Sequence, residues 1–72
     1  MRFLDRELVK NIRVVYPTGA RVVLIKMDDP QAPPAGTEGT VLRVDDIGTI
    51  HIRWDNGSSL GVVFGEDVIA LV

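Results

Sequence analysis

The residue types that carry chemistry are sparse in this 72-residue chain. Cysteine is absent, which excludes thiolate metal ligands, cysteine nucleophiles and disulfides. The single histidine, His51, lies in the middle of an alternating strand pattern, where a surface role is far more common than a catalytic one. Ser58 and Ser59 lie beside a predicted turn and lack the strand-to-helix elbow of a hydrolase nucleophile. We therefore expect a non-enzymatic protein with no catalytic residue and no cofactor.

Adjacent pairs of oxygen-bearing side chains raise the question of a metal site. Hard cations prefer carboxylate and amide oxygens, and such side chains occur together at positions 28–29, 45–46 and 55–56. None of these pairs has the spacing of a calcium-binding loop. Asp and Asn at turns are explained as well by hydrogen bonds to the adjacent backbone, so we expect no metal site.

The charged side chains are unevenly distributed along the chain, although the formal net charge is only −2. Residues 1–27 carry six basic and two acidic side chains, whereas residues 28–72 carry two basic and eight acidic ones. This asymmetry has two interpretations: the charged groups are solvated surfaces and nothing more, or the N-terminal segment docks on the rest of the chain partly through opposite charge.

The N-terminal segment has its apolar residues at helical spacing, with Asp5 placed to cap the first turn. A short helix is expected at about residues 6–14, with Leu4 packing on Val9 as a hydrophobic staple. Residues 16–19 then form a turn that ends the helix. A helix of this length is not stable alone, so we expect it to be held by docking.

Residues 39–64 read as three short strands joined by tight turns. Ile50, Ile52 and Trp54 alternate with polar residues, which is typical of a strand with one buried face. A three-residue loop at 55–57 brings all the large apolar groups to that face, with Trp54 closing against Ser58, Ile52 facing Leu60 and Ile50 facing Val62.

The preceding turn repeats this arrangement. A loop at 46–48 places Val44 opposite Ile50 and Leu42 opposite Ile52. Both loops end on a glycine, Gly48 or Gly57, that should have a positive φ.

The remaining segments complete the expected fold. Residues 20–27 form a strand that is apolar on both sides, one side facing the interior and the other the N-terminal helix. Three prolines make residues 28–38 a long loop, and residues 68–72 form a last strand that closes the sheet. The sequence therefore predicts a mainly β protein, a small five-stranded SH3-like barrel over residues 16–72 with one short N-terminal α-helix over residues 1–15.

Met27-Asp28-Asp29-Pro30 and Trp54-Asp55-Asn56-Gly57 are the more specific of several sequence blocks over residues 16–67. These blocks closely resemble an uncharacterised family of small SH3-like barrels from bacteria and their phages or mobile elements. The family has no assigned activity, so the resemblance implies a fold and a phage or mobile-element setting. The blocks Gly39-Thr40-Val41 and Trp54-Asp55-Asn56-Gly57-Ser58 are more weakly similar to mind-bomb-type domains, which bind peptides through longer loops than this chain has.

In an SH3-like barrel the natural ligand groove would lie between the loop at 28–38 and the turn at 45–48, and here it would be acidic. Such a groove repels nucleic acid, whose binding depends on Lys and Arg neutralising phosphates, and it favours a basic protein or peptide partner. Trp54 is either an aromatic wall of this groove or a core residue. The candidate partner-binding residues are Asp28, Asp29, Pro33, Pro34, Glu38, Asp45, Asp46 and Trp54.

Two alternatives stay open. A nucleic-acid-binding accessory domain would use the basic helix and the outer sheet face, through Arg2, Arg6, Lys10, Arg13, Arg43 and Arg53. A structural or dimerisation module would pair an exposed strand edge with another chain.

The surroundings of the protein are also constrained by composition. No apolar run approaches the roughly 18 residues of a membrane span, and the first residues do not form a secretory signal. We expect no membrane contact, a cytoplasmic location, and a monomer or weak homodimer.

Overall fold

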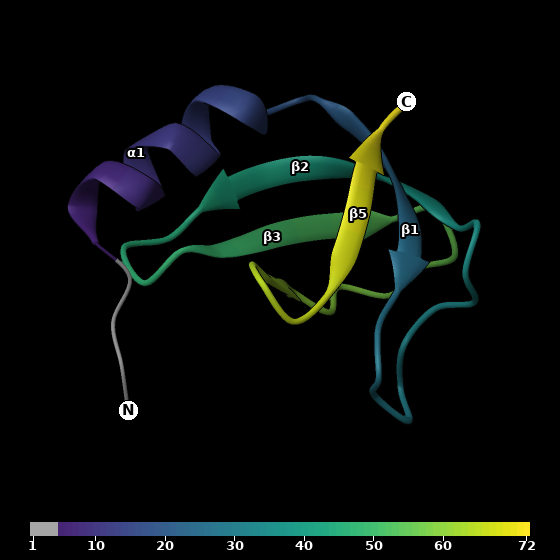
Figure 1. Ribbon diagram of the computed structural model, residues 1–72. Helices are drawn as coiled ribbons and strands as arrows, with labels where there is room; N and C mark the ends of the chain where they lie inside the picture. The colour runs from purple at the N-terminus through teal and green to yellow at the C-terminus, as the bar shows by residue number, and fades with distance from the viewer. Residues whose placement is uncertain (1–4) are drawn as a thin grey trace.

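The computed structural model describes residues 5–72, which form one short helix and five strands (Figure 1). The predicted staple residue Leu4 and the basic candidate Arg2 lie outside the described residues. The mainly β class expected from the sequence is confirmed. The elements are α1 (Arg6–Val15), β1 (Arg21–Lys26), β2 (Glu38–Val44), β3 (Thr49–Trp54), β4 (Val62–Val63) and β5 (Val68–Leu71).

Helix α1 begins at the predicted cap and packs on β2. The Asp5 carboxylate accepts a hydrogen bond from the Glu7 backbone N–H at 2.8 Å, which satisfies one of the unpaired donors of the first turn. Val9 and Ile12 are buried in the same core cluster as the strand residues. Burial of this apolar stripe is what holds so short a helix.

The five strands form one antiparallel sheet in the order β4-β3-β2-β1-β5. The predicted closed barrel is wrong, because within residues 5–72 no ladder joins β4 to β5, and β5 pairs with β1 as an edge strand. The predicted pairing of Ile52 with Leu60 is wrong, because residues 58–61 are irregular and β4 pairs with β3 only through Val62 and Val63. The Leu60 carbonyl accepts the Trp54 indole N–H at 2.9 Å, which turns this carbonyl toward a side chain.

Both predicted hairpin turns are confirmed. Gly48 has a φ of 87° and Gly57 a φ of 92°, which is the left-handed region that glycine adopts without steric cost. Ile50 pairs with Val44 on one side and with Val62 on the other. The Trp54 N–H donates to the Ser58 carbonyl at 3.0 Å, as a three-residue loop requires.

The predicted pairing of Leu42 with Ile52 is wrong. The register shifts between Val41 and Arg43, so Val41 pairs with Ile52. Val41 is 0% exposed and Leu42 is 38% exposed. Because β2 contains one extra residue at this point, the alternation of inward and outward side chains changes phase there. The prediction assumed unbroken alternation back from Val44 and therefore placed Leu42 inward.

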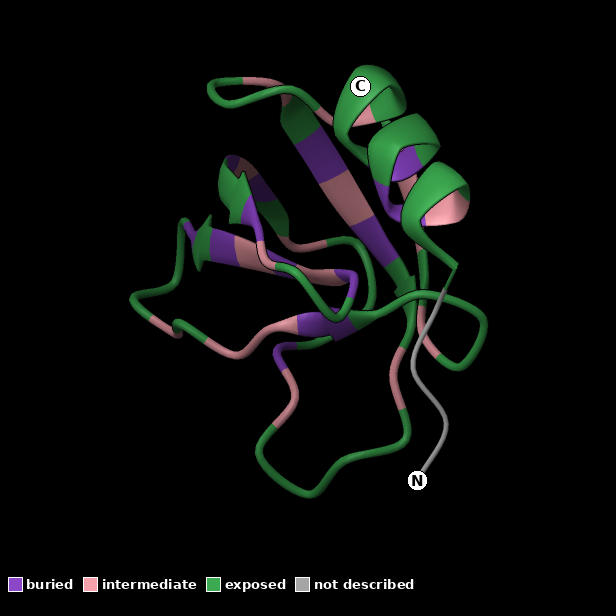
Figure 2. Ribbon diagram, turned by 90° about the vertical axis from the view of Figure 1, so that its left-hand side faces the viewer, coloured by how far each residue is buried: buried purple, intermediate pink, exposed green. Residues whose placement is uncertain are grey.

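The core lies between α1 and the concave face of the sheet. Buried positions alternate with more exposed ones along the strands (Figure 2), which is the period expected for one buried face. In β1, Val22 and Leu24 point into this core, whereas Ile25 is 51% exposed. The expectation that α1 covers the second face of β1 is therefore wrong, because α1 packs on β2.

Candidate functional site

The structure does not assemble the predicted acidic groove. The loop at 28–37 enters β2 at Glu38 and the turn at 45–48 leaves it after Val44, so the two segments lie at opposite ends of this strand (Figure 1). Seven residues of strand separate them by about 20 Å. The loop also stays close to β1, because the Leu24 carbonyl accepts from Gly36 N–H at 2.8 Å and the Leu24 N–H donates to Thr37 at 2.9 Å.

The acidic candidates at the first end of β2 have local partners. Asp28 lies 3.8 Å from the Lys26 ammonium group, and the Asp29 carboxylate accepts the Gln31 backbone N–H at 2.8 Å. Pro33 is buried and Pro34 is exposed. These groups shape the loop and form no shared charged surface with the second acidic segment.

Glu38 belongs to a cluster centred on Arg21, a residue that the sequence did not single out. The Arg21 guanidinium donates to both Asp55 carboxylate oxygens, at 2.9 and 2.5 Å, and lies 3.4 Å from Glu38. The hydrogen bonds from Arg21 hold the pKa of the Asp55 carboxyl below its ordinary value. The outward position of Arg21 in an alternating strand was the signal that could have located this cluster.

Asp45 stabilises the turn between β2 and β3. One of its carboxylate oxygens accepts the backbone N–H groups of Ile47 and Thr49, and the other lies 2.9 Å from His51 Nε2. Desolvation raises the pKa of the Asp45 carboxyl, but these hydrogen bonds more than offset it, so its pKa lies below the ordinary value. This is the turn role that Asp commonly has.

Trp54 is a core residue and not a groove wall. It is 1% exposed, and its indole N–H donates to the Leu60 carbonyl at 2.9 Å. A buried indole with its donor satisfied contributes packing and leaves no aromatic face for a partner.

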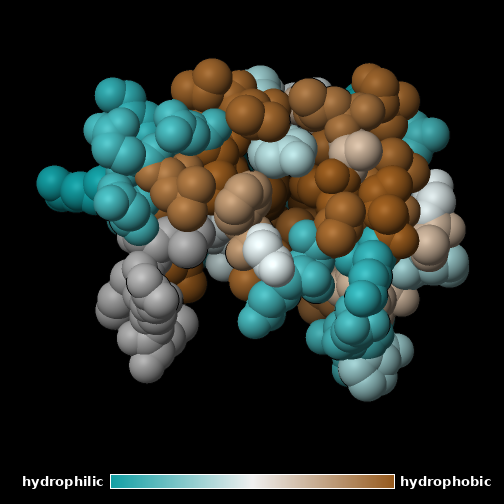
Figure 3. All heavy atoms as spheres, in the orientation of Figure 1, coloured by the Kyte–Doolittle hydropathy of each residue, from teal (hydrophilic) through white to brown (hydrophobic). Residues whose placement is uncertain are grey.

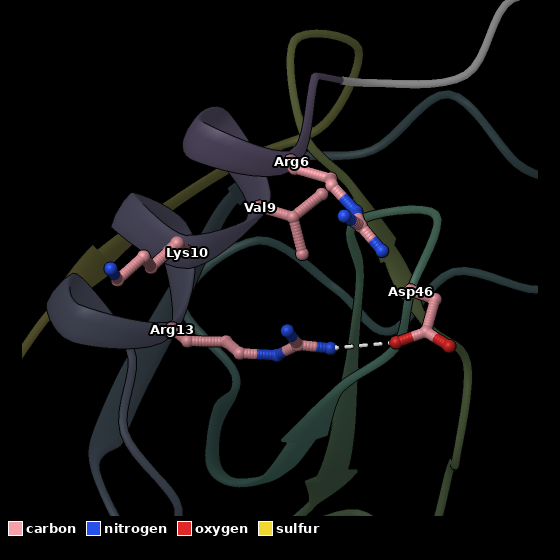
Figure 4. A pocket seen from close by; sticks show the side chains of 5 residues that line it. All are labelled: Arg6, Val9, Lys10, Arg13 and Asp46. Carbon is pink, nitrogen blue, oxygen red and sulfur yellow. Dashed lines mark hydrogen bonds and ion pairs between the residues drawn. The ribbon is translucent and has the colours of Figure 1, made fainter.

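The basic candidates on α1 border a hollow of about 410 Å³. Figure 4 shows Arg6 and Arg13, which are two turns apart on α1, reaching toward Asp46, while Lys10 on the turn between them points away. Arg13 donates to the Val44 carbonyl at 3.2 Å and to the Asp46 carboxylate at 3.1 Å. Among residues 5–72, neither Arg6 nor Lys10 forms an ion pair.

A second hollow, of about 280 Å³, also has Arg13 in its lining. Its lining includes Tyr16, Thr18 and Arg43. Arg13 lines both hollows, so the chain brings four basic side chains and one aromatic ring to one stretch of surface beside α1. We name this surface, formed by Arg6, Lys10, Arg13, Tyr16 and Arg43, the basic flank.

Arg53 does not line either hollow of the basic flank. It lies on β3 opposite Thr40. Tyr16 was absent from the sequence-based candidates, although its position three residues after Arg13 at the helix end was a usable signal.

A further hollow of about 530 Å³ brings His51, Ser58 and Ser59 to one wall. Within the described residues neither serine hydrogen-bonds to His51, and the Ser58 hydroxyl accepts from the Leu60 backbone N–H at 3.3 Å. No group of three or more potential ligands among residues 5–72 is arranged to hold a metal ion. No helix in the described chain is long and apolar enough to cross a membrane.

The fold and the basic flank define a small, mainly β domain with a candidate binding surface. The family model for the domain of unknown function DUF4314 matches residues 5–72, and the chain belongs to this family. The family domain thus takes in α1 as well as the sheet. No curated protein and no solved structure matches the chain.

Proposed function

We propose that this chain is a small protein-interaction module that binds an acidic segment of a partner protein at the basic flank. The observation that carries the proposal is that Arg13 forms the common wall of two hollows, which together present four basic side chains and Tyr16. Arg and Tyr are enriched where protein interfaces gain most of their affinity.

The proposal includes an SH3-like assignment of the fold and a cytoplasmic setting in bacteria or their phages. A five-stranded antiparallel sheet with a long loop after β1 and tight turns thereafter supports the fold assignment. The absence of cysteine is compatible with a reducing compartment.

Two features favour an acidic peptide over a nucleic acid. The chain has a net charge of −2 and a pI of about 5.1, so a long polyanion meets overall repulsion. Val9, Tyr16 and Pro17 also give the two hollows an apolar component. A peptide that alternates carboxylates with apolar side chains matches both the charge and the apolar lining.

Asp46 marks where a partner carboxylate would bind. Its ion pair with Arg13 is exposed, and its side chain is fully accessible. Exposed ion pairs contribute about 0–1 kcal/mol, so a partner carboxylate displaces Asp46 from Arg13 at little free-energy cost.

Fluorescence anisotropy tests this proposal with a labelled peptide of alternating glutamate and leucine. Replacing Arg6, Lys10 and Arg43 together by Gln should raise the dissociation constant about tenfold, since three exposed ion pairs of about 0.5 kcal/mol each are lost. The control replaces Lys26 and Arg53 by Gln, which removes two cations outside the basic flank and should leave the dissociation constant nearly unchanged.

The nucleic-acid alternative is an outcome of the same titration. An oligothymidylate of the same formal charge is the second probe. If the oligothymidylate binds more tightly than the peptide, with a salt slope that flattens in the triple variant, the basic flank is a phosphate-binding surface and the peptide proposal is abandoned. Equal effects of the triple variant and the control would also contradict it.

A further inference from the structure

Strand β5 has an unpaired edge. It pairs with β1 on one side, and among residues 5–72 no strand lies on its other side. The Val72 N–H donates to the Arg21 carbonyl at 3.0 Å. Because hydrogen-bonding direction alternates along an antiparallel ladder, the backbone groups of Ala70 face β1, and those of Ile69 and Leu71 point outward.

This edge lacks the charged side chains and proline that commonly keep an edge strand from pairing with another strand. Residues 68–72 are Val-Ile-Ala-Leu-Val. Leu71 is 53% exposed and Val72 is 71% exposed. Figure 3 shows hydrophobic residues gathered on the side of the molecule where β5 lies.

An apolar hollow of about 160 Å³ adjoins the edge at the open boundary between β4 and β5. A sixth strand placed along β5 would lie over this hollow. The lining is mainly apolar: Tyr16, Ile50, Val62, Phe64, Gly65, Val68 and Ile69, with Asp67 as its one charged residue. The occupant must therefore offer an extended backbone to the edge and uncharged apolar side chains to the hollow.

We propose that β5 of a second copy of this chain is that occupant, paired antiparallel with β5 about a twofold axis at Ala70. The strand has the required chemistry itself, since it is extended, uncharged and apolar. The axis places Ile69 of each copy opposite Leu71 of the other, so the outward N–H and C=O groups of both strands pair reciprocally.

The side chains are compatible with this register. Ile69 and Leu71 of each copy extend toward the hollow of the other, and the small Ala70 side chains meet at the axis. Val68 of one copy faces Val72 of the other. Like charges placed opposite each other would oppose pairing of two identical strands, and this register brings no charged side chains together. Apart from Tyr16, which lines this hollow as well as the basic flank, the inference uses no residue of the basic flank.

Sedimentation equilibrium of the whole chain over a concentration series tests the proposal. We expect a concentration-dependent dimer. Its dissociation constant should rise at least tenfold in Leu71→Glu, because each copy then brings one carboxylate into the apolar contact between the two β5 strands. Val63→Glu is the matched control, since Val63 is exposed on the opposite sheet edge, and it should dimerise like the parent. A monomeric parent at every concentration, or equal loss in both variants, overturns the proposal.

Amide hydrogen exchange supplies a second measurement that needs no variant. The Ile69 and Leu71 amides should become protected as the protein concentration rises, whereas the Ala70 amide, bonded to β1, should be protected throughout. Concentration-independent exchange at Ile69 and Leu71 overturns the proposal and leaves the edge to a strand from another protein.

Discussion

At the scale of single residues, two arginines of the N-terminal third connect it to the acidic remainder of the chain. Arg13 reaches Asp46, and Arg21 reaches Asp55 and Glu38. The opposite charges of these two parts of the sequence therefore form specific ion pairs in the structure. Each pair is exposed to solvent, so it directs the packing of the segments more than it stabilises them.

The two turn glycines should be irreplaceable by β-branched residues. Gly48→Val and Gly57→Val should each lower the free energy of unfolding by about 1–3 kcal/mol, because a β-branched side chain is strained at positive φ. Urea denaturation measures the loss. Ser59→Val, at an exposed position with an ordinary φ, is the control, and a loss equal to that of the control at both glycines would contradict the strain argument.

Asp45 should make stability depend on pH in the acid range. Its folded-state pKa lies below the ordinary value of 3.8, so the unfolded chain binds more protons in the interval between the two pKa values. The stabilisation is fully present above pH 3.8 and is lost as the pH falls through the folded-state pKa.

Urea unfolding of the parent and of Asp45→Asn across this range checks the expectation. The parent should lose stability with falling pH more steeply than Asp45→Asn. Asp28→Asn serves as the control because Asp28 is an exposed loop residue. Parallel curves for the parent and Asp45→Asn would show that the turn carboxylate is not responsible.

At the scale of elements, α1 is an integral part of the fold. Its buried stripe joins the core formed by β1, β2, β3 and β4, and the family domain includes it. Its opposite face is left to solvent and supplies the basic side chains. The same helix thus provides stability on one side and the candidate binding surface on the other.

Removing the buried anchor of α1 should destabilise the whole domain. Ile12→Ala should lower the free energy of unfolding by about 2–4 kcal/mol, as expected for a buried aliphatic side chain. For a domain of this size each kcal/mol corresponds to about 4–8 °C in Tm. Val14→Ala, at an exposed position of the same helix, is the control. If thermal unfolding followed by the strand signal is unchanged in Ile12→Ala, α1 is not docked.

At the scale of the whole molecule, the charges are divided between the two ends of β2. The end next to α1 carries the basic flank, and the other end carries Asp28 and Asp29 in the long loop. A partner segment with carboxylates therefore finds attraction at one end and repulsion at the other. Two carboxylates lie in the turn at the basic end: Asp46 is the exposed partner of Arg13, and Asp45 is bonded to its own turn and to His51.

Neutralising Asp46 should therefore strengthen acidic-peptide binding. Asp46→Asn releases Arg13 from its ion pair and should lower the dissociation constant about threefold, corresponding to roughly 0.6 kcal/mol. The anisotropy titration with the glutamate-leucine peptide measures it, with Asp28→Asn as the control of equal charge change. Weaker binding in Asp46→Asn would favour an acidic site for a basic partner instead.

The sequence by itself determined the local features of this protein. The cap at Asp5, the strand alternation around Ile50 and the glycine turns at Gly48 and Gly57 follow from interactions within a few residues, and the structure shows each of them. Such features depend on backbone sterics and side-chain period, which a short window of sequence contains. The mainly β class follows from them.

Tertiary structure alone decided which distant groups meet. The register shift in β2 turned the Leu42 side chain outward. The Trp54 indole N–H donates to the Leu60 carbonyl, which lies in the irregular segment before the short strand β4. The loop at 28–37 stayed with β1, which left the acidic segments about 20 Å apart, while docking of α1 placed Arg13 beside Asp46. These outcomes depend on the packing of segments far apart in the chain, where one shifted residue reverses a face, and so no local pattern encodes them.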